Sequence, residues 1–126
     1  MIQRYCNDRM ISKALVAASL KPFILSILAT GDSYGYEIIQ RVQDLTDGQI
    51  KWTTGTLYPL LHSLENKGLV TSFKREAESG PGPKRKYYRI TEKGRQSLVT
   101  EKQEWFKVHE ALLKLWSPLP GLSPAI

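Results

Sequence analysis

Cysteine is nearly absent from this chain. The one cysteine, Cys6, has no second thiol with which to form a disulfide inside the chain, and an unpaired cysteine fits a reducing compartment. The start of the chain also lacks an uninterrupted apolar run ahead of a small-residue cleavage site, which is the pattern of a secretory signal peptide. These two absences predict a cytoplasmic protein.

Long hydrophobic runs are absent as well. The longest, residues 14–20 and 22–29, are separated by Lys21, and each is shorter than the ~20 residues that a membrane helix requires. No membrane segment is therefore expected. The chain has 126 residues, of which 41% are hydrophobic, and this size fits a single domain with an ordinary core.

Residues that could carry out catalysis are few and scattered. The two histidines, His62 and His109, lie on different predicted elements, and no residues have the spacing of metal ligands. No nucleophile has a base placed beside it. The sequence therefore predicts that the protein is not an enzyme and needs no metal or cofactor.

Positive charge, by contrast, is concentrated in one segment. Residues 67–95 contain nine Lys or Arg and three acids, a net of +6 that equals the formal charge of the whole chain. Two β-type runs, 69–74 and 84–90, flank the breaker Gly80-Pro81-Gly82-Pro83 and predict a cationic hairpin. Such a hairpin can lie against a phosphate backbone, where each neutralised phosphate releases counterions. The alternative is an edge hairpin whose charges only keep it soluble.

Helical periodicity marks the region before this hairpin. We expect a first core helix to begin with Ser19 as its N-cap and to end at Gly31. Its apolar face consists of Leu20, Phe23, Ile24, Ile27 and Leu28. Residues 1–18 are expected to form an N-terminal arm or helix that can cross to a partner subunit.

Two further helices are predicted before the hairpin. Asp32 or Ser33 is expected to cap the second, which Thr46-Asp47-Gly48 closes. Thr53 is expected to cap the third, with Gly68 just beyond its end. The predicted buried face of the third helix consists of Leu57, Leu60, Leu61 and Leu64.

Pro59 conflicts with the third helix, because proline removes a backbone hydrogen bond and disfavours helical geometry at the preceding residue, Tyr58. Violations of local preference tend to occur at functional sites, so the first turn of this helix is interpreted as shaped for contact. The alternative is a helix that begins late, at Pro59.

A fourth helix is predicted from a Thr91 cap to about Trp116. Its apolar side has the spacing of a coiled-coil seam, and the residues of this side are Leu98, Trp105, His109, Leu112 and Trp116. A helix with such a seam requires a partner, so we expect residues 92–116 to be a dimerisation helix. The Pro- and Gly-rich tail, residues 117–126, is expected to be disordered.

Three short helices followed by a two-stranded wing predict a winged helix-turn-helix at residues 19–91, within a mainly α fold. In this architecture the third helix enters the major groove and the wing grips flanking backbone. The predicted DNA-binding residues are Tyr34, Thr54, Gly55, Thr56, Tyr58, His62, Lys84, Arg85 and Lys86. Tyr58 is the strongest single candidate; the alternative is a tyrosine half-buried against the wing with its hydroxyl in water.

Several linked motifs resemble those of the PadR family of bacterial winged-helix transcription regulators, over roughly residues 20–95. These are Tyr34-Gly35-Tyr36-Glu37-Ile38, Gly55-Thr56-Leu57-Tyr58-Pro59-Leu60-Leu61-His62, Leu64-Glu65, Lys67-Gly68-Leu69-Val70, Arg85-Lys86-Tyr87-Tyr88-Arg89-Ile90-Thr91 and Lys93-Gly94. The chain departs from the family at Ser63, where a basic residue is common, and at Thr54, where proline is common. Contacts at these two positions are therefore left open.

The resemblance implies a homodimeric repressor that binds an inverted-repeat operator, with the C-terminal helix as the dimer interface. The chain is similar to the small subclass of the family, in which a tryptophan of the last helix faces its symmetry mate and stacks planar aromatic compounds. Trp105 lies at the similar position, and two rings related by a two-fold axis can sandwich a flat molecule. The alternative is that Trp105 and Trp116 only pack in the interface.

Two other functions remain open at this point. One is a protein-interaction module in which the basic wing binds an acidic partner. The other is an architectural DNA-binding protein without an effector. Salt dependence and symmetric protection of two half-sites would favour regulation over both alternatives.

Overall fold

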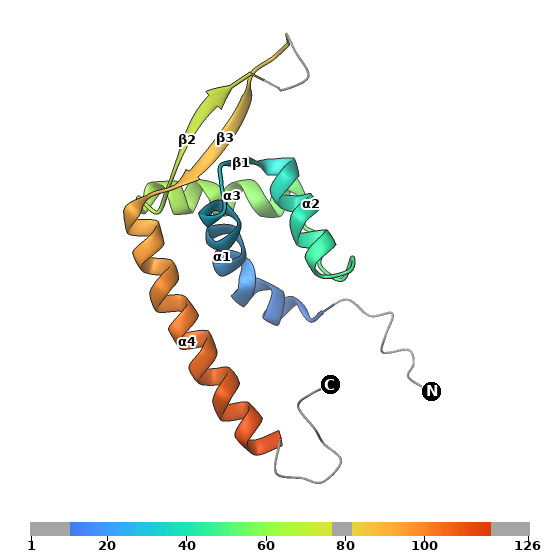
Figure 1. Cartoon of the computed structure of the whole chain (residues 1–126). Helices are drawn as coiled ribbons and strands as arrows, with labels where there is room; N and C mark the ends of the chain where they lie inside the picture. Colours follow the sequence, from blue (N-terminus) through green and yellow to red (C-terminus); the bar gives the residue numbers. More distant parts are fainter. Residues whose placement is uncertain (1–10, 77–81, 117–126) are drawn as a thin grey trace.

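The computed structural model describes residues 11–76 and 82–116 (Figure 1). The elements in chain order are α1 (Lys13–Ala29), β1 (Ser33–Tyr34), α2 (Gly35–Leu45), α3 (Thr54–Asn66), β2 (Val70–Arg75), β3 (Arg85–Ile90) and α4 (Glu92–Trp116). This arrangement confirms the predicted fold class, which is mainly α with a small β wing and a long C-terminal helix. The predicted tail, most of the predicted N-terminal arm and part of the predicted hairpin loop lie outside the described residues.

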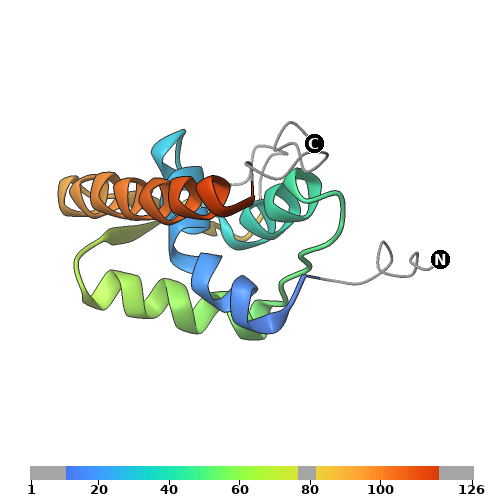
Figure 2. The same cartoon turned by 90° about the horizontal axis from the view of Figure 1, so that it is seen from below.

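The first helix is longer than predicted. α1 begins at Lys13, where the hydroxyl of Ser12 accepts a hydrogen bond from the backbone N–H of Leu15 at 3.3 Å. The prediction that Ser19 caps this helix was wrong, because Ser19 lies inside it and donates its hydroxyl to the Val16 carbonyl at 2.8 Å. The apolar pattern continues across Ser19, since Val16 and Leu20 both pack against the core. Figure 2 shows α1 lying between α3 and α4.

A short strand precedes α2, and the sequence did not predict it. Ser33 and Tyr34 pair with Tyr88 and Tyr87 of β3, and α2 then begins at Gly35 without a side-chain cap. The predicted capping by Asp32 or Ser33 was wrong, because both side chains have other partners. Asp32 binds Arg89, and the Ser33 hydroxyl donates to Glu37 at 2.5 Å.

α3 begins as predicted. Thr53 is its N-cap, and the Thr53 hydroxyl accepts a hydrogen bond from the Thr56 N–H at 3.3 Å. Pro59 lies inside the helix, which contradicts the alternative of a helix that begins at Pro59. The carbonyl that the missing Pro59 N–H would have bonded belongs to Gly55, an exposed residue that water can reach.

The wing forms a three-stranded antiparallel sheet with β1. The strand order is β1-β3-β2, and β2 pairs with β3 from Val70 opposite Ile90 to Arg75 opposite Arg85. Each strand begins one residue later than predicted. A hydrogen bond of 2.6 Å from the Ser72 hydroxyl to the Glu65 carboxylate joins β2 to α3. The sheet is therefore joined to the helical body on both sides, through β1, which leads into α2, and through β2, which is bonded to α3.

All four helices and the sheet contribute to one hydrophobic core. Its most deeply buried residues come from α1, α2, α3 and β2: Ile24, Leu25, Leu28, Ile38, Val42, Leu57, Leu61, Leu64 and Val70. Burial of a side chain of this size stabilises the fold by roughly 1.5–3 kcal/mol. Leu60, predicted to be buried with the other α3 leucines, is only partly buried.

α4 begins at the predicted cap and then leaves the body. The Thr91 hydroxyl accepts a hydrogen bond from the Gly94 N–H at 3.0 Å, and the helix continues to Trp116 as predicted. Its first half packs on α1, while its second half extends beyond the other helices (Figure 1). Among the described helices, none is long and apolar enough to cross a membrane.

Candidate nucleic-acid interface

One side of α3 faces solvent. Leu57, Leu61 and Leu64 are buried, and the opposite side carries Gly55 and His62, which are exposed. Thr54, a predicted DNA-binding residue, is half-buried. The exposed side presents a small residue and an imidazole, with no acidic group between them, to any molecule that approaches α3.

Four elements converge beside this exposed side. A hollow of about 460 Å³ is lined by Tyr34 of β1, Gly35 and Tyr36 of α2, Tyr58 of α3, and Arg85 and Lys86 of β3. The predicted DNA-binding residues Tyr34, Tyr58, Arg85 and Lys86 therefore lie around one concave surface, although they are up to 52 positions apart in the chain. The two cations and three phenol hydroxyls of this surface can all donate hydrogen bonds to phosphate.

Tyr58 is held close to the start of α2. Its side chain is 39% exposed, and its hydroxyl lies so near Gly35 that a Cβ atom at position 35 would overlap it. Only glycine leaves room for this approach, a requirement that the sequence motif gave no means of detecting. The alternative of a half-buried Tyr58 is partly right about its exposure, but the hydroxyl lies against α2 within the hollow.

An ion pair joins β3 of the wing to the residue that precedes β1. Arg89 of β3 donates two hydrogen bonds to the Asp32 carboxylate, at 3.0 Å from Nε and 2.7 Å from the terminal nitrogen. The hydrogen bond from Arg89 holds the pKa of Asp32 below its usual value, against the opposing effect of burial. Such a two-pronged contact restricts orientation as well as distance, so it helps to set the angle of the wing.

The cations of the wing lie over aromatic rings. The guanidinium of Arg85 lies 4.4 Å from the centre of the Tyr34 ring, and that of Arg75 lies 3.9 Å from the centre of the Tyr87 ring. Arg89 lies 4.7 Å from the Phe73 ring centre. These contacts restrain the long side chains of Arg75 and Arg85, whereas Arg89 is also held by Asp32. Neither Arg75 nor the pairing of these cations with aromatic rings was predicted, because the register between strands decides which ring lies beneath which cation.

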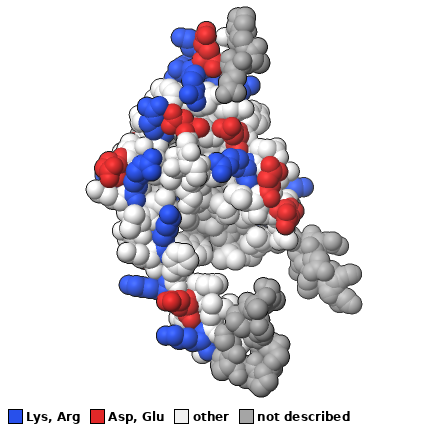
Figure 3. Space-filling model, in the orientation of Figure 1, with Lys and Arg blue, Asp and Glu red and all other residues white. Residues whose placement is uncertain are grey.

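The remaining predicted contacts lie outside the hollow. Lys84 is exposed just before β3 and does not line it, while Thr56 is exposed on another flank of α3, beside a groove formed with α1. In Figure 3 the Lys and Arg side chains crowd the wing at the top of the view, with acidic side chains among them. The described residues contain no group of three or more His, Cys, Asp and Glu that could hold a metal ion.

The predicted seam of α4 is mostly exposed. Trp105 is 41% and Trp116 53% exposed, and His109 and Leu112 are also exposed. Leu98 differs: it is 4% exposed within the core of the same chain. The prediction that Leu98 contributes to an intersubunit seam was wrong, because the first half of α4 packs on α1 with this side.

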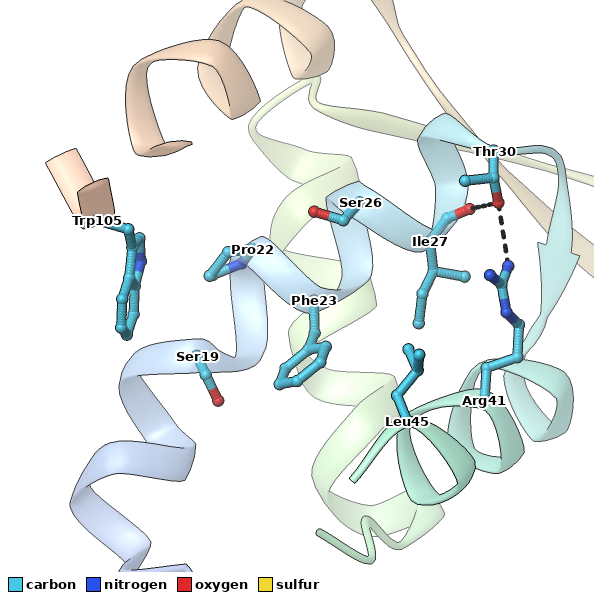
Figure 4. Close-up of a pocket in the computed structure, with 9 residues that line it drawn as sticks. All are labelled: Ser19, Pro22, Phe23, Ser26, Ile27, Thr30, Arg41, Leu45 and Trp105. Atoms are coloured by element: carbon cyan, nitrogen blue, oxygen red, sulfur yellow. Dashed lines mark hydrogen bonds between the residues drawn. The ribbon is translucent and has the colours of Figure 1, made fainter. Parts of the chain in front are cut away.

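A second hollow lies where α4 leaves the body. It has a volume of about 470 Å³, and its walls come from α1, α2 and α4. Figure 4 shows the Trp105 ring beside Pro22, with Phe23, Ile27 and Leu45 directed toward the same space. Thr30 accepts a hydrogen bond from Arg41 at 3.0 Å at the far end. Most of the surface of this hollow is apolar, and Trp105 in its wall comes from the exposed half of α4.

Comparisons with known proteins agree with this geometry. The family model described as the transcriptional regulator PadR-like family matches residues 24–100. The structure is similar to a PadR-like transcriptional regulator from Bacillus cereus, with a TM-score of 0.75 and 29% identity, covering 85% of this chain and 100% of the other. It is also similar to a transcriptional regulator from Clostridium thermocellum, with a TM-score of 0.73 and 32% identity, covering 83% and 97% of the two chains.

One protein that is similar in sequence is likewise a transcriptional regulator. The transcriptional regulator YqjI of Escherichia coli is 34% identical over 93 residues, which are 74% of this chain and 42% of that protein. The chain thus spans less than half of the length of this relative.

Proposed function

Because the chain belongs to the PadR-like family of transcriptional regulators, we propose that it acts in the cytoplasm as a dimeric repressor and binds an inverted-repeat operator through α3 and the wing. The observation that carries this proposal is the convergence of α3, the start of α2 and β3 around one hollow lined by Arg85, Lys86 and three tyrosines. A surface formed by α3 and the wing together can follow a groove and its flanking phosphates at the same time.

Individual residues receive separate roles in this proposal. Gly55 and His62 on the exposed side of α3 face base edges, and Thr54 lies at the entrance of this side. Thr56 donates its hydroxyl from the neighbouring flank of α3. Tyr58 and Tyr34 donate hydroxyl hydrogen bonds at the rim of the groove. Lys84, Arg85 and Lys86 neutralise phosphates along the wing, with Arg85 preoriented by its position over Tyr34.

The exposed half of α4 is proposed as the dimer interface. It carries Trp105, His109, Leu112 and Trp116 on the continuation of the side that buries Leu98. Exposed apolar patches of this kind usually mark an interaction site. A pair of α4 helices would set the distance between the two α3 helices, which must match about 34 Å or a multiple of it for successive turns of DNA.

A small planar aromatic effector is proposed to bind at Trp105. The support is the mostly apolar hollow of about 470 Å³ that has this ring in its wall, since aromatic rings stack and bury area well in such sites. A bound molecule would change the spacing of the two α3 helices and shift the population away from the DNA-binding form.

The test is selection of bound duplexes from fragmented genomic DNA, followed by binding titrations at several salt concentrations. We expect footprint protection of two related half-sites and an affinity that falls steeply with salt. Reversal of Lys84, Arg85 and Lys86 to Glu should weaken all duplexes alike, whereas Tyr58→Phe should change the preference among sequences. Absence of duplex binding at low salt would favour a protein-interaction module instead, and sequence-tolerant affinity would favour an architectural protein.

A further inference from the structure

Tyr58 and Glu65 lie on the same side of α3. They are seven residues apart in the chain, which is close to two complete turns of an α-helix, so their side chains point in nearly the same direction. Tyr58 lines the hollow between α3 and the wing, whereas Glu65 does not. The side of α3 that carries Tyr58 therefore continues to Glu65, near the end of the helix.

Glu65 contacts the wing through a hydrogen bond. The Ser72 hydroxyl of β2 donates to the Glu65 carboxylate at 2.6 Å, and Ser72 lies directly opposite Tyr88 of β3. Burial raises the pKa of the Tyr88 phenol, and the neighbouring Tyr58 and Glu65 raise it further, so the phenol lies near both residues of α3. Tyr58, Glu65, Ser72 and Tyr88 together form one contact region, hereafter the α3–wing joint.

Ser72 is the last residue of β2 that is bonded to a helix. Among the described residues, no hydrogen bond or ion pair joins residues 73–75 of β2 to any helix, and the wing projects away from the helices (Figure 1). Lys86 and Arg85 lie two and three residues beyond the position opposite Ser72, which is roughly 7–10 Å along a strand. A change in the tilt of the wing at Ser72 would therefore displace both cations relative to α3.

We propose that Glu65 is a positioning residue for DNA binding. By holding Ser72, it sets the angle between α3 and the wing, so that Arg85 and Lys86 meet phosphates while α3 lies in the groove. A carboxylate suits this role, because a hydrogen bond to a charged acceptor is stronger than one between neutral groups. The inference rests on the proposed function and adds to it the part of the chain that aligns the two DNA-binding elements.

Salt titrations with a labelled duplex, recovered by the selection from genomic DNA, provide the test. Each phosphate contact contributes about 0.9 to the slope of log K against log salt. Ser72→Ala should make this slope shallower by about one to two units and weaken binding about fivefold for each lost contact at physiological salt. Ser72→Thr keeps the hydroxyl and should keep the native slope. A loss of stability alone would not change the slope, provided that circular dichroism shows each variant to be folded at the assay temperature.

Glu65→Ala separates a positioning role from that of a simple surface charge. Removal of an acid that only repels phosphate should tighten DNA binding, whereas loss of the α3–wing joint should weaken it. The double variant Glu65→Ala with Ser72→Ala should bind no more weakly than either single variant, because both substitutions remove the same hydrogen bond. Thr71→Ala is the matched control and should keep the native slope, since Thr71 is the exposed neighbour of Ser72 in β2 and points to the opposite face of the sheet.

Three results would overturn the inference alone, if the native protein binds the duplex. They are a native slope for Ser72→Ala, tighter binding by Glu65→Ala, or additive losses in the double variant. Failure of the native protein to bind any duplex at low salt would overturn the proposed function, and this inference with it.

Discussion

Substitution of Gly35 by alanine should weaken DNA binding through Tyr58 without unfolding the protein. A Cβ atom at position 35 would overlap the Tyr58 hydroxyl and ring, so the phenol must rotate out of the hollow that it shares with Arg85 and Lys86. The ring is the far end of a side chain that is 39% exposed, and therefore it can move at low cost to the fold.

The expected magnitudes follow from this geometry. Gly-to-Ala changes at a compatible helix position stabilise a protein by roughly 0.4–1 kcal/mol, which approximately offsets the cost of displacing the ring, so the free energy of unfolding should change by less than about 1 kcal/mol. Leaving a buried hydrogen-bonding group without its partner costs about 1–3 kcal/mol. Loss of the bond from Tyr58 to a base edge should therefore weaken operator binding by roughly 5- to 150-fold.

A double-mutant cycle tests the proposed coupling between the two residues. Fluorescence anisotropy with a labelled operator should show that Gly35→Ala weakens binding in the native background and has almost no further effect once Tyr58→Ala is present. Gly82→Ala is the matched control, because a Cβ atom there would have nothing within 4 Å. Full affinity of Gly35→Ala, or an equal loss with and without the Tyr58 ring, would refute the reasoning.

Three further predictions concern stability and assembly. Gly94→Ala should destabilise the fold by about 1–3 kcal/mol, because its Cβ would overlap the backbone carbonyl of Leu69 rather than a movable side chain; urea unfolding measures this, and unchanged stability would contradict it. Asp32→Asn should lower stability at neutral pH, because the Asp32 carboxylate forms an ion pair with Arg89 and its pKa is lowered from 3.8 in the folded state. Protonation removes this ion pair, so the effect of the substitution should become progressively smaller as the pH falls below about 4. Equal effects of Asp32→Asn at pH 7 and pH 2 in thermal melts would exclude this account. Leu112→Glu should convert the dimer to a monomer in analytical ultracentrifugation while leaving the helical content unchanged, and a dimer that persists would remove the α4 interface from the proposal.

The elements that the sequence predicted best are those in which local signals agree. Thr53 and Thr91 mark helix starts, because a hydroxyl at an N-cap satisfies an N–H of the first turn whatever the rest of the chain does. The Pro- and Gly-containing break between two β-type runs predicted the wing to within one residue at the start of each strand. Leu57, Leu61 and Leu64 were predicted to be buried from their spacing alone, and they are.

The predictions that failed depend on partners distant in the chain. Ser19 has a suitable side chain for an N-cap, but the helix begins six residues earlier, at Lys13, because Val16 packs against the core. Asp32 is an acceptable N-cap too, but its carboxylate is used by Arg89, 57 positions away. The spacing of Leu98 fits an intersubunit seam, but the side chain is buried in the core of its own chain and cannot reach a second subunit.

The amino-acid sequence by itself determined the kind of molecule: a small, mainly helical protein whose positive charge is gathered on a hairpin behind a short leucine-backed helix. Periodicity, capping residues and local charge are properties of neighbouring residues, so they can be recognised in the sequence alone. Only the tertiary structure decided that Tyr34, Tyr58 and Arg85 surround one hollow, that Gly35 makes room for a phenol, and that Glu65 is bonded to Ser72 of the wing. These features depend on side chains from separate elements meeting at distances of a few ångströms, which the register of the sheet and the packing of the helices set and which no local pattern encodes.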